Sequence, residues 1–371
     1  MTQKGKSGFR YRLSKGAGRL VPSLLTILLA LLVGAVVIAV SGNDPLNAYK
    51  QMILGAFGSK SRFSETVIKA VPLTLLALGT SVAYRAKVWN IGLDGQFTIG
   101  AIFAVVVTQL VGGEGFPTIA VSFLAAIVGG ALWGGIAGLL KARFQANEVI
   151  TTLMLNYVAN YLLAYLIRGP MMDPNGGNNP QSASIAKSLY LPTFIPGMRM
   201  NVGVFIAIFF VIVLYFFWRS RLGYSFKLIG ASHPVARYAG QNVPFLVCLT
   251  MIISGGIAGI AGWTEIFGAQ HKLLDDISSG FGNLAIVVAL LGNLRPVDIA
   301  IASFFFAAML TGGQALQRTT DVPVSVVSII QGLVIIFIIC RTVLDSDSFR
   351  IWLSSRKARK AEATAAVKGG N

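Results

Sequence analysis

Long apolar runs are the feature that most constrains the fold of this chain. A helix of about 20 apolar residues crosses the hydrocarbon core of a bilayer. Such runs recur along the chain, at residues 21–41, 65–84, 88–111, 117–140, 148–167, 201–218, 244–263, 281–293, 296–317 and 323–342. The eighth run is short for a full crossing, and the third is interrupted by polar residues. We therefore predict an all-α, polytopic integral membrane protein with about ten transmembrane helices.

The composition agrees with a membrane protein. Only 12% of the 371 residues are charged and 54% are hydrophobic, whereas a soluble domain has roughly 25% charged residues. The formal net charge of +17 would also suit nucleic-acid binding, but the basic residues gather at the ends of apolar runs. Cys248 and Cys340 lie inside such runs, so we expect small packing groups and not a disulfide framework.

Charge at the ends of the runs predicts their orientation. Basic residues, with no acid among them, precede the first run at Lys4, Lys6, Arg10, Arg12, Lys15 and Arg19, and others follow the last at Arg341, Arg350, Arg356, Lys357, Arg359, Lys360 and Lys368. Because basic residues stay on the cytoplasmic side, we expect both termini in the cytoplasm and an even number of spans. Most acids then fall outside: Asp44, Glu65, Glu114, Asp173, Glu265, Asp275, Asp276 and Asp321.

The same pattern divides the chain into segments. Residues 1–20 form a basic cytoplasmic segment, residues 21–345 the transmembrane domain, and residues 346–371 a basic cytoplasmic tail. The first run exceeds the 7–15 apolar residues of a secretory signal, so we interpret it as a retained anchor. Two hydrophilic segments are too long for simple turns: 168–200 on the outside and 219–243 on the inside.

A polar stretch interrupts the third run. It places Asn90, Asp94 and Gln96 at membrane depth, where an ionisable group usually faces a protein interior or a pathway. Irregular backbone at that depth survives only against protein or a water-lined cavity. If the stretch is helical, Asn90 and Asp94 share a face and Gln96 turns away. We predict that these three residues line a pathway; the alternative is a buried polar knot that fixes helix packing.

Further polar residues in the runs are candidates for the same pathway. Asn156 and Asn160 lie four residues apart in the fifth run and could bind a ribose or a base edge, or bridge helices. Asn293 is a candidate on polarity alone. Glu148 stands near the start of its helix, where the helix dipole favours an acid. Glycines at small-xxx-small spacing predict packing faces: Gly130, Gly134, Gly138, Gly255 and Gly259.

Several kinds of chemistry find no support in the sequence. No phosphate-binding loop is present, since Gly5-Lys6-Ser7 lacks the earlier glycine. His233 and His271 fall on opposite sides of the predicted membrane, so no metal cluster and no Ser-His-acid arrangement is indicated. Carboxylates deep in the predicted membrane are sparse, essentially Asp94 alone, which disfavours a proton relay. The energy for transport is therefore expected from another subunit.

Four patches carry a family resemblance. They are Asn90 to Gln96, Asn147 to Tyr157, the outer-loop motifs from Gly169 to Ser182, and Ala289 to Asn293 with Pro296 after it. Together they resemble the permease subunits of bacterial ABC importers for simple sugars, branched-chain amino acids and nucleosides. The nucleoside-type permeases are the more similar branch. The resemblance covers roughly residues 65–340.

The inner loop resembles the coupling helix of that family, which packs in a cleft of the ATPase subunit. Glycines at positions 230 and 240 are expected to bracket a short helix, with Ser232 or the preceding turn as its cap and Pro234 in its first turn. Ala231-Ser232 stands where the family has Glu-Asn. The residues to which the resemblance assigns ATPase coupling are Gly223, Gly230, Ser232, His233, Pro234, Arg237 and Gly240.

The resemblance implies a permease without enzymatic activity that forms the translocation pathway for nucleosides. It implies no cofactor bound by this chain, with ATP and Mg used by a partner ATPase. The expected partners are an ABC ATPase subunit, a second permease, an extracytoplasmic substrate-binding protein or lipoprotein, and membrane lipid, but no nucleic acid. The expected location is the bacterial cytoplasmic (inner) membrane. The alternatives are a permease for ribose or galactose, an ion-coupled secondary transporter, and a structural scaffold.

Overall fold

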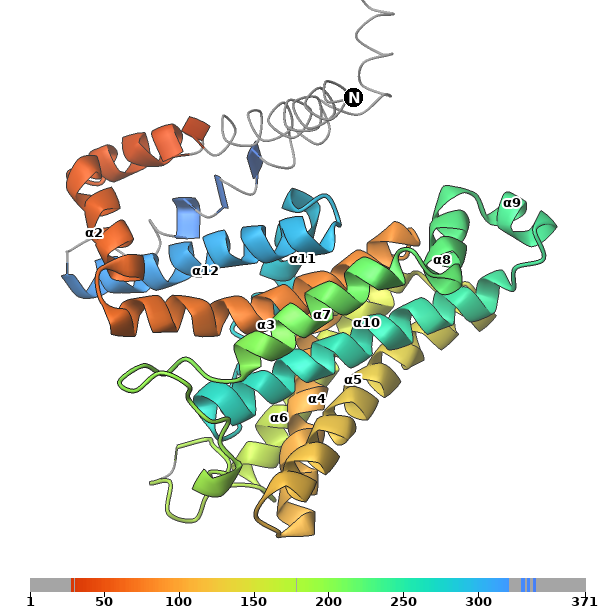
Figure 1. The fold of residues 1–371 in the computed structure, drawn as a ribbon, viewed down its shortest axis with the longest axis horizontal. Helices are drawn as coiled ribbons and strands as arrows, with labels where there is room; N and C mark the ends of the chain where they lie inside the picture. Colours follow the sequence, from red (N-terminus) through yellow and green to blue (C-terminus); the bar gives the residue numbers. More distant parts are fainter. Residues whose placement is uncertain are drawn as a thin grey trace, which may run out of the picture. The chain divides into compact units, whose positions relative to one another are not determined.

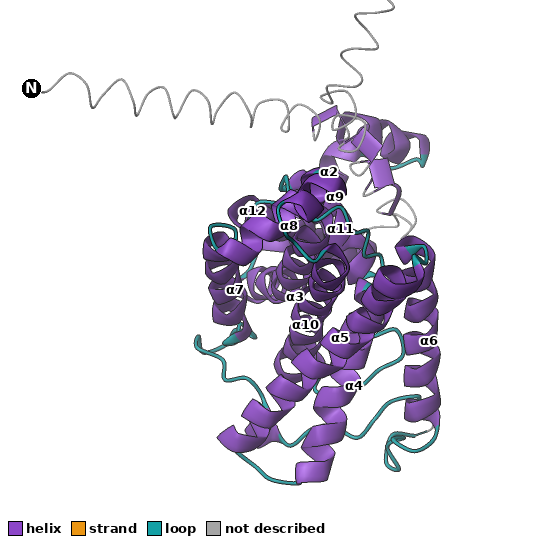
Figure 2. Cartoon of the chain, turned by 90° about the vertical axis from the view of Figure 1, so that its right-hand side faces the viewer, coloured by secondary structure: helices purple, strands orange, loops and turns teal. Residues whose placement is uncertain are grey.

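The computed structural model describes residues 28–29, 31–177, 179–319, 328–330, 332–333 and 336–337. Within these ranges the regular structure is helical, and β pairing is limited to isolated bridges (Figure 2). The helices are α2 (Pro45–Phe57), α3 (Lys60–Arg85), α4 (Leu93–Val111), α5 (Phe116–Phe144), α6 (Glu148–Arg168), η1 (Lys187–Leu189), α7 (Gly203–Phe217), α8 (Arg221–Ala231), α9 (His233–Tyr238), α10 (Val243–Glu265), η2 (Ile266–Gln270), α11 (Phe281–Leu291) and α12 (Pro296–Thr319).

The helix lengths identify a multi-pass membrane protein. Among the described residues, 6 helices are long and apolar enough to cross a membrane, or up to 8 if two bent pairs each form one span. One bent pair joins Leu31–Val40 to α2 at 118°, and the other joins α7 to α8 at 72°. α11 is shorter, as the sequence indicated. The predicted terminal segments 1–20 and 346–371, and most of the tenth run, lie outside the described residues.

Most apolar runs became helices near the predicted positions. Capping explains several of the starts: the side chains of Ser59, Asn147 and Asn242 accept hydrogen bonds from backbone amides in the first turns of α3, α6 and α10. α2 was missed, because polar residues such as Lys50 and Gln51 dilute its apolar pattern.

The third run differs from its expected helix. Residues 88–92 are not helical, and α4 begins only at Leu93. The helical geometry considered for Asn90 and Asp94 is therefore wrong, because Asn90 precedes the helix. The Oδ1 atom of Asn90 instead accepts a hydrogen bond from the Gly92 amide at 3.0 Å, an Asx-type turn that satisfies a backbone donor outside any helix.

The chain divides into two compact units, one comprising Met1–Gln51 with Leu316–Asn371 and the other Met52–Ala315. In the described part of the first unit, the Tyr49 hydroxyl donates to the Leu31 carbonyl at 2.6 Å. In the second, α10 packs extensively against α5, α4 and α3, and these helices run side by side (Figure 1). The functional residues discussed below all lie in the second unit.

The predicted small-residue packing faces are confirmed in that second unit. A Cβ placed on Gly130 would lie 2.2 Å from the Gly255 carbonyl oxygen, and one on Gly259 would lie 2.1 Å from the Ala126 carbonyl oxygen. α5 and α10 thus approach at backbone contact, a distance that only glycine permits.

The outer loop predicted at 168–200 is docked along the segment that follows α10. Its backbone amides at Ser182 and Leu191 donate to the carbonyls of Leu273 and Phe267 at 3.0 and 2.9 Å. The loop is therefore an ordered cover over the C-terminal end of α10.

Candidate translocation and coupling sites

Asn90 forms the centre of a buried hydrogen-bond network. Its amide group exchanges two hydrogen bonds with the amide of Gln96, at 2.9 and 3.0 Å, and also donates to the Ser254 hydroxyl of α10 at 2.9 Å. With the bond from the Gly92 amide, both donors and both acceptor sites of the Asn90 side chain are used. Gln96 therefore faces Asn90 and does not turn away from it.

Asp94 and Asn156 extend the network to two further helices. The Asp94 carboxylate accepts the amide of Gly282 in α11 at 2.8 Å, and it also interacts with the Ser278 hydroxyl and the Asn283 amide. The Asn156 side chain of α6 accepts the Gly95 amide at 2.8 Å and donates to the Ile91 carbonyl at 2.9 Å. Four of the predicted pathway residues thus lie in one buried network between helices.

The other two predicted pathway residues lie apart from this network. Asn160 is one turn further along α6 and is half-buried. Asn293 lies in the exposed turn between α11 and α12, with a positive φ of 49°. Its polarity suits that turn, because Asn tolerates the left-handed region.

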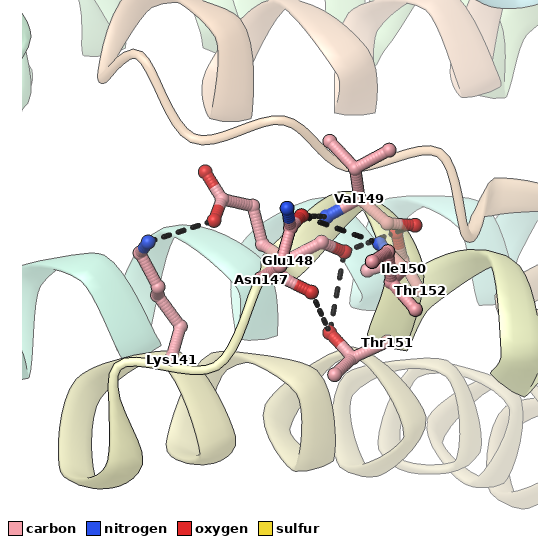
Figure 3. Close-up of polar contacts among 7 residues, drawn as sticks. All are labelled: Lys141, Asn147, Glu148, Val149, Ile150, Thr151 and Thr152. Atoms are coloured by element: carbon pink, nitrogen blue, oxygen red, sulfur yellow. Dashed lines mark hydrogen bonds and ion pairs between the residues drawn. The ribbon is translucent and has the colours of Figure 1, made fainter.

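Glu148 is the first residue of α6 (Figure 3). Asn147 caps the helix by accepting the Val149 amide at 3.0 Å, and Lys141 at the end of α5 forms a 2.8 Å ion pair with Glu148. Thr152, one turn on, donates to the Glu148 carbonyl at 2.6 Å. Its hydroxyl also accepts a hydrogen bond from the Ile91 backbone amide at 3.3 Å. The start of α6 is therefore bonded to the irregular 88–92 segment.

The predicted coupling loop folds into two helices. The short helix is confirmed as α9, with Ser232 at its N-cap position and Pro234 in its first turn. The boundary at Gly230 is wrong: this glycine lies inside α8, where a Cβ would come within 2.1 Å of the Arg85 carbonyl oxygen. Gly240 does end the segment, with a positive φ of 75°.

The predicted coupling residues differ in exposure. His233, Pro234, Arg237 and Gly240 are exposed, whereas Gly223 and Gly230 are buried where α8 meets α7 and α3. The base of α8 is held by Trp218, whose ring faces the Arg85 guanidinium at 4.3 Å and whose carbonyl accepts from Lys227 at 2.7 Å. α8 therefore contacts both α9 and α3.

Glu265 is a candidate that sequence reasoning missed. It was assigned to an outer loop, but it ends α10, inside the candidate membrane span Val243–Gln270, and is only 7% exposed. Among the described residues, Asp94 is therefore not the one buried carboxylate in a candidate span. The Glu265 carboxylate accepts a 3.0 Å hydrogen bond from Gln270, and Lys69, Arg199 and Glu65 act on it electrostatically. α10 continues as the π-helix η2, which no apolar pattern foretells.

Charged residues of α3 and of the 168–200 loop lie close to that point. Arg199 forms a 2.7 Å ion pair with Glu65 and donates to the Ala269 carbonyl at 3.1 Å. The ring of His271 stacks on Tyr190 at 3.5 Å. Burial, together with the charge of Arg199, lowers the pKa of His271. Within the described residues, no group of His, Cys, Asp and Glu side chains could hold a metal ion.

Comparisons with known proteins identify the family of this chain. The family model described as "Branched-chain amino acid transport system / permease component" matches residues 62–339. A glucose ABC transporter permease protein of Haloferax volcanii is 35% identical, over 85% of this chain and 86% of its own length. A guanosine ABC transporter permease protein of Bacillus subtilis is 30% identical, over 87% and 94%.

A third relative matches nearly the whole chain. The nucleoside ABC transporter permease protein of Lactococcus lactis is 29% identical, over 94% of this chain and 97% of its own length. The family match spans the second compact unit almost completely and contains the Asn90 network, α9 and Glu265. This chain belongs to the branched-chain amino acid transport permease family of ABC transporters.

Proposed function

We propose that this chain is the permease subunit of an ATP-driven importer and forms the path by which nucleosides cross the membrane. The observation that carries the proposal is the match to two permeases named for guanosine and nucleosides, each aligned over more than nine-tenths of its own length. The nucleoside-type motifs in the outer loop support the same substrate class.

The proposed assembly follows the expectations from sequence. About ten spans, with the basic segments 1–20 and 346–371 in the cytoplasm, anchor the domain 21–345 in the bacterial cytoplasmic (inner) membrane. A separate ATPase subunit hydrolyses ATP with Mg, so this chain is not itself an enzyme. A second permease completes the pathway, and an extracytoplasmic binding protein or lipoprotein delivers the solute.

The coupling role belongs to α9. Its six residues end in an exposed turn, and Tyr238 is 94% exposed, which suits a helix that is covered by another subunit. Replacing His233–Tyr238 by a Gly-Ser linker of equal length should abolish uptake while the protein still accumulates in the membrane. Uptake that persists in this variant would contradict the proposal, because transport would then not need the coupling helix.

The Asn90 network has a structural part in this proposal. Its side chains bond to one another, to the Ser254 hydroxyl of α10, and to backbone groups of α4, α11 and the 88–92 segment. We propose that it pins α4, α6, α10 and α11 around the pathway. Direct solute contact by Asn90, Asp94, Gln96, Asn156, Asn160 or Asn293 stays a prediction.

A sugar is the second candidate substrate. The 35% identical relative is named for glucose, and a nucleoside contains a sugar ring as well. The deciding measurement is uptake of labelled uridine in cells with and without this gene, in competition with unlabelled adenosine, ribose and glucose. Loss of uptake on deletion, with competition by adenosine only, supports the nucleoside; unchanged uridine uptake, in cells without a second uridine importer, supports the sugar.

A further inference from the structure

The least satisfied buried charge among the described residues is the carboxylate of Glu265. Its Oε1 atom accepts from Gln270 at 3.0 Å, and no second donor from the described residues reaches the carboxylate. Asp94, by comparison, has the Gly282 amide, the Ser278 hydroxyl and the Asn283 amide. An ionised carboxylate can accept about four hydrogen bonds. Glu265 can therefore accept further hydrogen bonds, and a buried carboxylate that lacks them is unfavourable in free energy.

The π-helix links this buried carboxylate to an exposed side chain. η2 follows Glu265 directly, and its i→i+5 spacing brings the Gln270 amide back over the carboxylate. Gln270 is exposed, whereas Glu265 beneath it is buried. π-helical turns are rare and are often found at functional sites, because they re-aim side chains at some cost in helix geometry.

The surrounding charges balance. Lys69 and Arg199 lower the electrostatic cost of the Glu265 charge, and Glu65 raises it. Two acids and two bases leave no net charge, so the site does not select for an ionic solute. Lys69 also donates to Gln314 of α12, so the cluster offers ammonium, amide and carboxylate groups together. This set of donors and acceptors suits a neutral solute that has several hydroxyl groups.

We propose that Glu265, with Gln270 and Lys69, is the outward-facing subsite that binds vicinal hydroxyls of a sugar ring. The proposal rests on the importer function above. A carboxylate accepts two neighbouring hydroxyls, one at each oxygen, and the amide and the ammonium donate to the hydroxyl oxygens. Vicinal ring hydroxyls are the group that glucose and ribonucleosides share, so this subsite recognises the sugar and leaves the base to other residues.

The test compares solutes with and without the hydroxyls. Initial uptake rates of labelled uridine and of 2′,3′-dideoxyuridine, and of glucose and 2-deoxyglucose, are measured in cells that carry the complete importer with wild-type permease or Glu265→Gln. In the wild type, we expect the solute that has the hydroxyls to have a KM about 10- to 100-fold lower than its deoxy analogue. This ratio corresponds to the free energy of a hydrogen bond to a charged group. Glu265→Gln should raise the KM of the hydroxylated solute to near that of its deoxy analogue, and leave the analogue's KM unchanged.

Controls separate binding from folding. Glu114→Gln makes the same chemical change at an exposed outer-loop acid and should keep the wild-type preference, with the amount of each variant in the membrane measured by immunoblot. If Glu265→Gln does not accumulate in the membrane, Gln270→Leu at the exposed position replaces it. In that variant, the preference for the hydroxylated solute over its deoxy analogue should fall several-fold. If Glu265→Gln leaves the ratio of the two KM values unchanged, or raises the KM of both members of a pair equally, the subsite is overturned while the importer function stands. Wild-type cells that import neither uridine nor glucose would overturn both.

Discussion

At the scale of single residues, buried polar side chains separate into two groups by their partners. Asn90 uses all of its hydrogen-bonding capacity within the protein, whereas Glu265 does not. A polar side chain at membrane depth can therefore have either of two roles. A satisfied group stabilises packing, and an unsatisfied one remains able to bind a solute.

Removing the Asn90 side chain should destabilise the protein. Asn90→Ala leaves the Gln96 amide, the Ser254 hydroxyl and the Gly92 amide without their partner, and we expect a loss of about 2–4 kcal/mol in the free energy of unfolding. Thermal unfolding of the detergent-solubilised protein measures it. Asn160→Ala, the same change at a half-buried position outside the network, should have a much smaller effect. Equal losses at both positions would contradict the proposed pinning role.

His271 predicts a pH dependence of stability. Its lowered pKa means that the folded state binds fewer protons than the unfolded state, whose histidine has a pKa of about 6.5. The contribution of His271 is therefore fully present above that value and is lost as the pH falls below it. The melting temperature, measured between about pH 7.5 and 5, should fall less in His271→Gln than in the wild type. A parallel fall in the two proteins would show that His271 makes no such contribution.

At the scale of the elements, the α5–α10 contact depends on glycines. Gly130→Ala would place a methyl group 2.2 Å from a backbone oxygen. Overpacking of this kind lowers the free energy of unfolding by roughly 1–3 kcal/mol, because a backbone atom cannot move away without displacing its helix. The nearest atom to a Cβ on Gly256 is 3.5 Å away, so Gly256→Ala should be tolerated. Unfolding in detergent compares the two variants. Similar stabilities of the two variants would mean that α5 and α10 can move apart without lowering the free energy of unfolding.

At the scale of the whole molecule, the sidedness of the chain can be tested directly. In a background with Cys248→Ala and Cys340→Ala, we expect Asn175→Cys in the outer loop to react with a membrane-impermeant maleimide in intact cells. Tyr238→Cys in α9 should react only after the cells are opened. Both positions are exposed, so a difference reports location and not burial. Labelling of Tyr238→Cys in intact cells would contradict a cytoplasmic coupling helix.

The sequence alone determined the class of protein and most helix positions. Runs such as 117–140 and 148–167 are long enough to cross a bilayer, and their apolar composition excludes a soluble fold. The small-xxx-small glycines predicted a packing face on each of the runs that became α5 and α10, but not that these two faces meet. Motifs indicated the permease family before any contact was known. The break at Asn90 was visible as polarity, but its geometry was not.

Only the tertiary structure decided which polar residues are satisfied. Asn90 meets Ser254 across 164 positions of sequence, and Asp94 meets Gly282 across 188, distances over which local patterns carry no information. Glu265 resembled a loop acid because it stands at the end of an apolar run, and the π-helix that covers it leaves no periodic signal. Hydrogen-bond satisfaction depends on partners brought together by folding, so it had to be observed in the folded chain.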